Sequence, residues 1–561
     1  MSAVFDPGRY RRYAELTALL QEWAAAYPGL CALAEIARSA AGRSVWAVTL
    51  TNRETGPDTA KPGYLVDANT HAGEVTGGAA ALYTIHWLLT QYGADPVATE
   101  ILDTRAFYVL PRIAVDGVEL FLTTPHAVRS SPKRYPPQAP EAELPTGLYP
   151  EDVNGDGAIL QMRLPHPDGD WQIDDQDPRL MVRRAPDSRD GKFYKLYIEG
   201  VIKGDWNGQA IPPVRRPWGL DFNRNYPAFW NPEGKQPGAG PYPLSEPETR
   251  AVADFLLAHP NIGAYVAYHT TGGILLRPPS NGPDDKLNAA DLESFRRIGE
   301  LCTRITGHPC KSTYQAFWYP GQEALVKGAD DWAYEHLGIQ AFTFELWNPD
   351  LRAGAQGYAQ IGLKGLLEQT SAETLAHHRK LLAWNDAELG GKGFVNWQPF
   401  DHPQLGPVEI GGWEMKRSLQ NPPEGPLLVA QICRAAQFTF QHALSTPRLA
   451  LTLKAERVGD GLYKLSAGVR NVGALATNVT EMARAMQTAR PIEVRLSGDV
   501  RVLSGQARRE IGHLEGWAVS GGTPARNETW VDWLVEANPG ASVVVTAGTS
   551  RAGEARAELV L

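Results

Sequence analysis

The chain has 561 residues, a formal net charge of −9 at pH 7, 43% hydrophobic residues and 21% charged residues. That composition is ordinary for a globular protein, and the length exceeds what one core usually supports, so we expect a large domain and a smaller one. The net negative charge argues against a broad nucleic-acid-binding surface, which would be basic. No apolar run approaches the roughly 20 residues that span a bilayer, so we expect no membrane insertion.

The cysteines and the N-terminus indicate the kind of cross-links and the cellular compartment to expect. Four scattered cysteines form no CxxC pair, which argues against a disulfide scaffold and against a cysteine-built zinc site. The first residues, MSAVFDPGRYRRY, lack the apolar core and cleavage site of a signal peptide. We therefore expect a cytoplasmic protein; the alternative is a secreted protein from which a leader has been removed.

Over the first 350 residues, continuous apolar stretches alternate with stretches in which apolar residues recur at helical spacing. A helix is expected near 16–23, and in chain order the remaining expected elements are strand 63–69, helix 75–90, strand 106–111, helix 246–258, strand 264–269, helix 284–306 and strand 341–347. Continuous apolar strands between helices indicate a sheet that is buried on both faces, hence an α/β fold.

Two regions depart from this rhythm. Residues 132–150 are rich in proline and 151–218 in Asp, Gly and Pro, which predicts a long surface insertion at about 130–218. After about residue 445, apolar and polar residues alternate around a Gly-Asp-Gly turn at 459–461. We expect a larger α/β domain over 1–440 and a smaller, all-β, sandwich-like domain over 446–561.

Candidate metal ligands follow two of the predicted strands. DANTHAGEVTGG places His71 and Glu74 after the strand at 63–69, and YVAYHTTGG places His269 at the end of the strand at 264–269. The carboxyl edge of such a sheet is where α/β proteins hold their sites. HxxE arises often by chance, but two histidines and a glutamate form a known catalytic zinc set.

Two further segments supply polar groups beside aromatic residues. AFTFELW places Glu345 in an apolar strand, where a carboxylate is either structurally paired or the base that a zinc hydrolase needs. LDFNRNYPAFW contains Asn223 and Arg224. These are either part of a polar turn or a grip for a carboxylate, because a guanidinium binds that group through two parallel hydrogen bonds.

In this order, HxxE, DxNRN, a strand ending in His-Thr and FTFEL resemble the zinc carboxypeptidase (funnelin) family over roughly residues 8–390. The resemblance implies an α/β/α sandwich around a mixed, largely parallel eight-stranded sheet. It also implies one Zn²⁺ per chain on His71, Glu74 and His269, with Glu345 as general base and proton shuttle. Asn223 and Arg224 would bind the terminal carboxylate of a peptide substrate.

Other roles carried over by the resemblance have one or two candidates each. Asp221 would support a zinc histidine through a hydrogen bond. The arginine that polarises the scissile carbonyl would be Arg129, with Arg134 as its rival, after a turn that here reads AVDG. The tyrosine that closes over substrate would be Tyr314, in a matching YQA context, or Tyr319, and the loop that holds them is longer than in the pancreatic enzymes.

The run GADDWAYEHLG resembles the same segment of carboxypeptidase B. By that resemblance Asp330 lies at the base of the side-chain pocket, where a buried carboxylate would favour C-terminal lysine or arginine. The alternative is that Asp330 points to solvent in a lengthened loop.

EDVNGDGAILQMR, inside the predicted insertion, matches the start of a calcium-binding loop at Asp152, Asn154 and Asp156. Arg163 stands where that loop needs a glutamate, so the alternative is an Asp/Asn/Gly turn without an ion.

Together these features predict a zinc metallocarboxypeptidase that acts on peptides; a preference for C-terminal lysine or arginine is a hypothesis. One alternative is a related zinc hydrolase, an N-acyl amino acid deacylase or an amidase acting on cell-wall peptides; these usually lack the Asn-Arg pair. A non-catalytic peptide-binding protein on the same scaffold is the alternative from another class, and it would normally have lost Glu345 or a metal ligand.

Overall fold

The computed structural model describes residues 5–136, 145–322, 325–518 and 525–561. Its central feature is a mixed sheet of eight strands in the order β1-β2-β4-β3-β11-β14-β12-β13. In chain order these strands are β1 (Cys31–Arg38), β2 (Ser44–Leu50), β3 (Gly63–Ala68), β4 (Ala106–Leu110), β11 (Ile262–His269), β12 (Ile274–Arg277), β13 (Cys310–Ser312) and β14 (Gln340–Glu345). The four central strands β4, β3, β11 and β14 run parallel.

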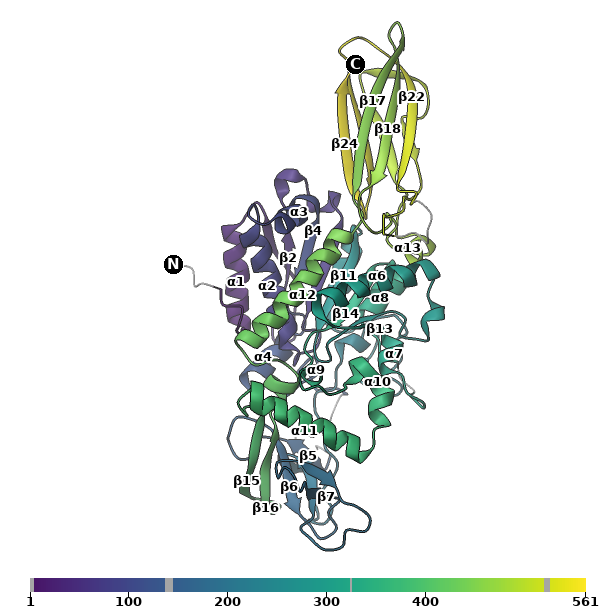
Figure 1. The fold of residues 1–561 in the computed structure, drawn as a ribbon. Coiled ribbons are helices and arrows are strands. Elements are labelled where there is room, and N and C mark those ends of the chain that lie inside the picture. The colour runs from purple at the N-terminus through teal and green to yellow at the C-terminus, as the bar shows by residue number, and fades with distance from the viewer. Residues whose placement is uncertain (1–4, 137–144, 323–324, 519–524) are drawn as a thin grey trace.

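Helices cover both faces of this sheet (Figure 1). The helices of the first 445 residues are α1 (Tyr13–Ala26), α2 (Val75–Gln91), α3 (Pro96–Thr104), α4 (Val115–Thr123), α5 (Pro247–Ala258), α6 (Ala289–Thr306), α7 (Thr313–Phe317), α8 (Ala329–Leu337), α9 (Pro349–Arg352), α10 (Tyr358–Leu367), α11 (Ser371–Glu388) and α12 (Pro426–Ser445). The prediction of an α/β/α sandwich is confirmed.

Side-chain contacts show which helices lie on which face. Because side chains alternate along a strand, Tyr64 of β3 and Tyr268 of β11 both point to the face covered by α12, where their hydroxyls bond to His442 and Thr439. The opposite face holds Tyr108 of β4, whose ring packs on α5. Helix α8 also lies on this opposite face, where Asp330 hydrogen-bonds to Thr343 of β14.

The predicted insertion forms strands of its own. They are β5 (Gly147–Pro150), β6 (Gln161–Pro165), β7 (Trp171–Ile173), β8 (Met181–Arg183), β9 (Tyr194–Ile198) and β10 (Gly200–Lys203). β6–β9 join β15 (Phe394–His402) and β16 (Gly406–Trp413) in one six-stranded sheet at the lower end of Figure 1. The region is therefore a small β unit that two distant parts of the chain complete.

The last part of the chain forms two four-stranded antiparallel sheets, β17-β18-β22-β20 and β21-β19-β23-β24. Its elements are β17 (Leu449–Gly459), β18 (Leu462–Asn471), α13 (Glu481–Ala485), β19 (Glu493–Gly498), β20 (Val500–Ser504), β21 (Arg508–Glu510), β22 (Glu528–Ala537), β23 (Ser542–Thr549) and β24 (Gly553–Val560). Their inward side chains, such as Leu465, Val531 and Val545, form a separate core. This C-terminal sandwich projects from the α/β part in Figure 1.

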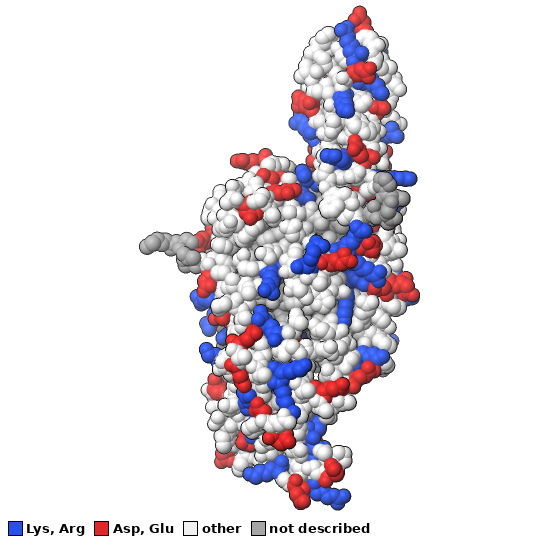
Figure 2. All heavy atoms as spheres, in the orientation of Figure 1, with Lys and Arg blue, Asp and Glu red and all other residues white. Residues whose placement is uncertain are grey.

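The surface carries charges of both signs. Lysine and arginine are interspersed with aspartate and glutamate over the face shown in Figure 2, and no large field of one sign appears there. Within the described residues, no helix is long and apolar enough to cross a membrane.

Candidate metal and substrate site

The candidate metal ligands lie where three parallel strands end. His269 and Glu345 are the last residues of β11 and β14, and the register of these strands places them directly opposite each other. His71 and Glu74 lie in the turn between β3 and α2. Because parallel strands bring their carboxyl ends to one edge, residues far apart in sequence meet there.

The three predicted ligands converge. The Nδ1 atom of His71 lies 2.8 Å from one carboxylate oxygen of Glu74, the Nδ1 atom of His269 lies 2.7 Å from the other, and the two Nδ1 atoms are 3.1 Å apart. All three side chains are buried. Four donors at zinc–nitrogen distances of 2.0–2.1 Å lie about 3.3 Å apart in a tetrahedron. A small outward adjustment of this His₂Glu set would therefore accommodate Zn²⁺.

Asp221 holds His71 from the other side of its ring. Asp221 Oδ1 lies 3.0 Å from His71 Nε2, which directs Nδ1 toward the other ligands, as expected for the outer partner of a metal-binding histidine. Arg129 donates from Nε to Asp221 Oδ2 at 3.0 Å. Burial alone would raise the pKa of Asp221, but Arg129, Arg224 and His71 together outweigh burial and hold that pKa well below its ordinary value. Asp221 therefore stays ionised.

Glu74 is also kept in its ligand form. Burial favours the neutral acid, but the neighbouring His71 and His269 outweigh burial and lower the pKa of Glu74. Arg129 Nη1 donates to Glu74 at 3.1 Å, so one guanidinium contacts both carboxylates of the cluster.

Glu345 has a different environment. Its Oε2 atom is buried, and no described residue hydrogen-bonds to it. Burial, reinforced by the negative charge of Glu74, raises the pKa of Glu345 to about 8. A bound cation would lower that pKa. A carboxylate with a free oxygen beside the ligand cluster can accept and return a proton near neutral pH.

One cavity of about 280 Å³ contains the ligand cluster, Arg129 and Glu345. The same cavity is also lined by Asn223, Arg224 and Asp330. Asn223 and Arg224 belong to a short 3-10 helix at Phe222–Arg224 that Asp221 caps through the Asn223 amide. Arg224 Nη1 donates to the carbonyl of Lys327 at 2.6 Å. The structure thus brings the residues predicted to bind a substrate carboxylate beside the predicted metal ligands.

Asp330 does not point to solvent, so that alternative is wrong. The residue is 3% exposed, lies in the first turn of α8 and lines the cavity. Burial raises its pKa, although His269 and a hydrogen bond from the Thr343 hydroxyl oppose that effect. The neighbouring Asp331 is buried as well, so this wall of the cavity carries two carboxylates.

The structure brings neither predicted tyrosine to this cavity. Tyr314 stacks on Trp318, with ring centroids 5.6 Å apart, and lines a smaller pocket next to it. Tyr319 lines neither of these pockets. The tyrosine that lines the cavity is Tyr358, at the start of α10, whose hydroxyl donates to the Thr271 carbonyl. Sequence reasoning missed it because no motif surrounds it.

Arg134 lines a separate cavity of about 410 Å³, next to Trp218 and Gln420, whereas Arg129 lines the one with the metal cluster. The geometry therefore favours Arg129 for the predicted role beside the scissile carbonyl.

In the loop at 152–158, which the structure describes, no contact supports a calcium site. Asp152 accepts hydrogen bonds from the backbone amides of Gly155, Asp156 and Gly157. Asn154 and Asp156 accept from amides two residues further on. These oxygens therefore satisfy the amides of the loop itself, as in an Asx turn, and Arg163 pairs with Glu409 instead of approaching the loop.

Known proteins match the region that holds this site. Carboxypeptidase A2 of Mus musculus is 25% identical over 358 residues, which are 61% of this chain and 63% of that protein. Carboxypeptidase B of Bos taurus is 24% identical over 349 residues, 60% of this chain and 63% of that protein. The chain thus spans less than two thirds of the length of either relative.

Two solved structures are also similar. Thrombin activatable fibrinolysis inhibitor has 20% sequence identity and a TM-score of 0.39, covering 68% of this chain and 75% of that one. Carboxypeptidase A from Helicoverpa armigera has 18% identity and a TM-score of 0.38, covering 69% and 76%.

Family comparison covers most of the chain. Residues 449–560, the C-terminal sandwich, match a family described only as a domain of unknown function. Residues 16–359, which include β3, β11, β14 and every residue of the ligand cluster, match the zinc carboxypeptidase family. The chain belongs to the zinc carboxypeptidase family.

Proposed function

We propose that this protein is a zinc-dependent metallocarboxypeptidase that removes the C-terminal residue of peptides and prefers lysine and arginine there. The observation that carries the proposal is one cavity in which His71, Glu74 and His269 converge next to Glu345, with Asn223 and Arg224 beside them. A set of metal ligands alone is compatible with many hydrolases, whereas a carboxylate-binding pair beside it is typical of an exopeptidase.

His71, Glu74 and His269 would hold the metal. Zn²⁺ bound there supplies Lewis acidity and lowers the pKa of a water molecule that it ligates. Glu345 Oε2, which is free of other hydrogen bonds, accepts the proton of the attacking water and later donates it to the leaving amine.

Arg129 lies between Asp221 and Glu74 with part of its side chain exposed to the cavity, so its guanidinium can stabilise the oxyanion. Asn223 and Arg224 bind the terminal carboxylate, and this fixes which peptide bond lies next to Glu345.

The preference for basic residues rests on Asp330 and Asp331. Two buried carboxylates in one wall of the cavity disfavour each other's ionisation, and burial followed by the charge of Asp330 raises the pKa of Asp331. An incoming ammonium or guanidinium group would stabilise their charged forms. A neutral side chain would leave them without such a partner.

The test combines metal analysis with a peptide panel. The purified protein should contain one zinc per chain. It should cleave peptides ending in lysine or arginine faster than otherwise identical peptides ending in phenylalanine, and it should act poorly on the same peptides with an amidated C-terminus.

Each departure from that pattern has a distinct meaning. A clear preference for phenylalanine would exclude the assigned role of Asp330. Hydrolysis of N-acyl amino acids or cell-wall peptides without hydrolysis of free peptide C-termini would indicate another zinc hydrolase. Zinc binding with no turnover of any of these substrates would indicate a binding protein.

A further inference from the structure

Helix α8 joins the substrate side of the cavity to the C-terminal sandwich. Its first turn holds Asp330 and Asp331 in the cavity wall, and its last residue, Leu337, is followed by Gly338 at the surface of the sandwich. Nine helical residues span about 13 Å, so the two ends of a short, stiff element contact different parts of the molecule.

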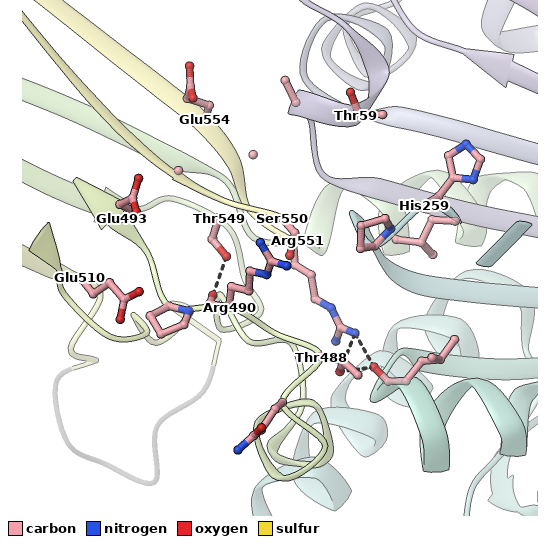
Figure 3. A pocket seen from close by; sticks show the side chains of 18 of the residues that line it. Thr59, His259, Thr488, Arg490, Glu493, Glu510, Thr549, Ser550, Arg551 and Glu554 are labelled. Carbon is pink, nitrogen blue, oxygen red and sulfur yellow. Dashed lines mark hydrogen bonds between the residues drawn. The ribbon is translucent and has the colours of Figure 1, made fainter. Parts of the chain in front are cut away.

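Three side chains of the C-terminal sandwich bond to the carbonyls at the end of α8. Thr488 Oγ1 donates to the Leu337 carbonyl at 2.7 Å, and Thr480 Oγ1 donates to the Gly338 carbonyl at 2.6 Å. Arg551 donates to both carbonyls, at 2.7 Å for Gly338. Figure 3 shows Arg551 and Thr488 directed at the same point. The last carbonyls of a helix have no partner within it, so the sandwich caps α8.

The environment of Arg551 indicates that this contact is its main role. The residue is 3% exposed, and within the described residues no carboxylate forms an ion pair with it. Burial lowers its pKa to about 10. A buried charge is costly without compensation. Here the carbonyls and the negative end of the α8 dipole provide that compensation at the two Nη atoms, whereas Nε has no hydrogen-bond partner among the described residues.

The backbones approach closely at the same place. Gly338 has a φ of 62°, and a Cβ atom added to it would lie 2.3 Å from the Cα of Ala483 in α13. Only glycine permits this contact. Asp291 of α6 adds a lateral link, because it accepts from the hydroxyl of Tyr334 in α8 at 2.9 Å and from the amide of Glu481 at 2.6 Å. The sandwich therefore holds α8 at its end and along its side.

The opposite end of α8 positions the substrate groups. The amide of Ala329 donates to Asn223 Oδ1 at 3.3 Å, and Arg224 donates to the carbonyl of Lys327, two residues before the helix. Asp331 accepts from the Gly328 amide at 2.9 Å. A displacement of α8 would thus move Asp330 and loosen both Asn223 and Arg224.

We propose that the C-terminal sandwich positions the substrate-binding wall of the cavity through α8, with Arg551 as the principal positioning residue. The metal ligands belong to β11 and to the turn between β3 and α2, and Arg551 hydrogen-bonds to neither. The inference rests on the proposed function only for its kinetic consequence; the mechanical link between sandwich and helix stands on the contacts alone.

The experiment compares full-length, zinc-loaded wild type with Arg551→Ala, Arg551→Lys, Thr488→Val and Arg490→Ala. Thr488→Val removes one bond to α8 and no buried charge, so it tests the link even if Arg551→Ala folds poorly. Arg490 is the matched control. Like Arg551, it lines a second cavity, of about 740 Å³, between the sandwich and the α/β part (Figure 3). Within the described part of the chain its guanidinium donates no bond to α8.

The first measurement is amide hydrogen exchange, which needs no activity. Arg551→Ala should speed exchange in residues 328–338 by about tenfold or more, with a smaller effect for Thr488→Val, since local opening follows the loss of tertiary contacts. Peptides covering 63–74 and Arg490→Ala should match wild type. Unchanged exchange in α8 for both Arg551→Ala and Thr488→Val would overturn the proposal.

The second measurement is kinetics on a peptide ending in lysine. Arg551→Ala should raise KM about tenfold with kcat within about twofold and zinc content unchanged, and Arg551→Lys should recover part of the loss. A fall in kcat or zinc content at constant KM would overturn the proposal. If wild type hydrolyses no peptide, the proposed function fails, while the exchange result still decides the link.

Discussion

The two sides of the cavity are built in different ways. The metal side consists of residues at the ends of adjacent parallel strands in the middle of the sheet, where Glu345 lies opposite His269 by strand register. The substrate side consists of a short 3-10 helix and the start of α8, which are held by loop carbonyls and by contacts from residues more than 140 positions further along the chain. Substitutions on the metal side should therefore alter chemistry, and those on the substrate side should alter binding.

The largest expected effect is on the metal side. Glu345→Gln keeps the shape of the side chain but removes the proton acceptor, so turnover should fall by about 10²–10⁴-fold, the range typical of general acid–base catalysis. Zinc content, measured on the same preparation, should not change, because Glu345 is not among the three converging donors. Near-normal turnover would refute the assignment of Glu345 as the base.

The metal side was also the part that sequence alone predicted. His71 and Glu74 come soon after the apolar strand β3, and His269 ends β11. A buried parallel strand gives a strong signal because nearly every residue in it is hydrophobic. The four central strands β4, β3, β11 and β14 were found for the same reason. The flanking strands β1, β2, β12 and β13 were not predicted; the residues of β1 are mostly partly or fully exposed, and β12 and β13 have only four and three residues.

The substrate side was predicted less completely, because its geometry depends on long-range contacts. Tyr358 lies 13 positions after Glu345 with no recognisable motif, and only the folded chain brings it to the cavity. Arg551 is an ordinary arginine in sequence, and nothing local indicates that it caps α8. The pairing of β6 with β16 joins segments about 250 residues apart, so the predicted insertion could not be recognised as a sheet.

The next prediction tests the substrate side directly. Arg224→Ala should reduce kcat/KM by about 10–150-fold, the equivalent of losing a hydrogen bond to a charged group, mainly through KM. The matched control is the same peptide with an amidated C-terminus, on which wild type and variant should be equally poor. An equal loss on both peptides would show that Arg224 supports the fold rather than the terminal carboxylate.

A smaller effect is expected at the base of the pocket. Asp330→Asn keeps the volume and removes the charge, so the ratio of kcat/KM for lysine over leucine should fall roughly tenfold. Glu335→Gln, in the same helix but outside the cavity lining, is the control and should leave the ratio unchanged. A ratio that stays constant in Asp330→Asn would assign the specificity to another residue.

The smallest effect concerns the scaffold of the metal side. His442 of α12 is fully buried, with Nδ1 2.9 Å from the Tyr64 hydroxyl of β3 and Nε2 3.0 Å from Gln340 Oε1 of β14. Burial lowers its pKa from 6.5 to about 3. A histidine with a depressed folded-state pKa contributes stability above its unfolded pKa of 6.5, and this contribution is lost progressively as pH falls from 6.5 toward 3.

Between pH 7 and 5.5 that loss should be about 1 kcal/mol, because the unfolded chain binds the proton and the folded chain does not. Urea unfolding followed by the helical signal would report it, since α12 and nearly all other helices lie in the first 445 residues. His442→Gln cannot titrate, so its stability should fall by that much less over the same interval. Equal acid sensitivity in both proteins would mean that His442 is not kept neutral by its position between β3 and β14, and that the metal side is less rigidly supported than its strand register suggests.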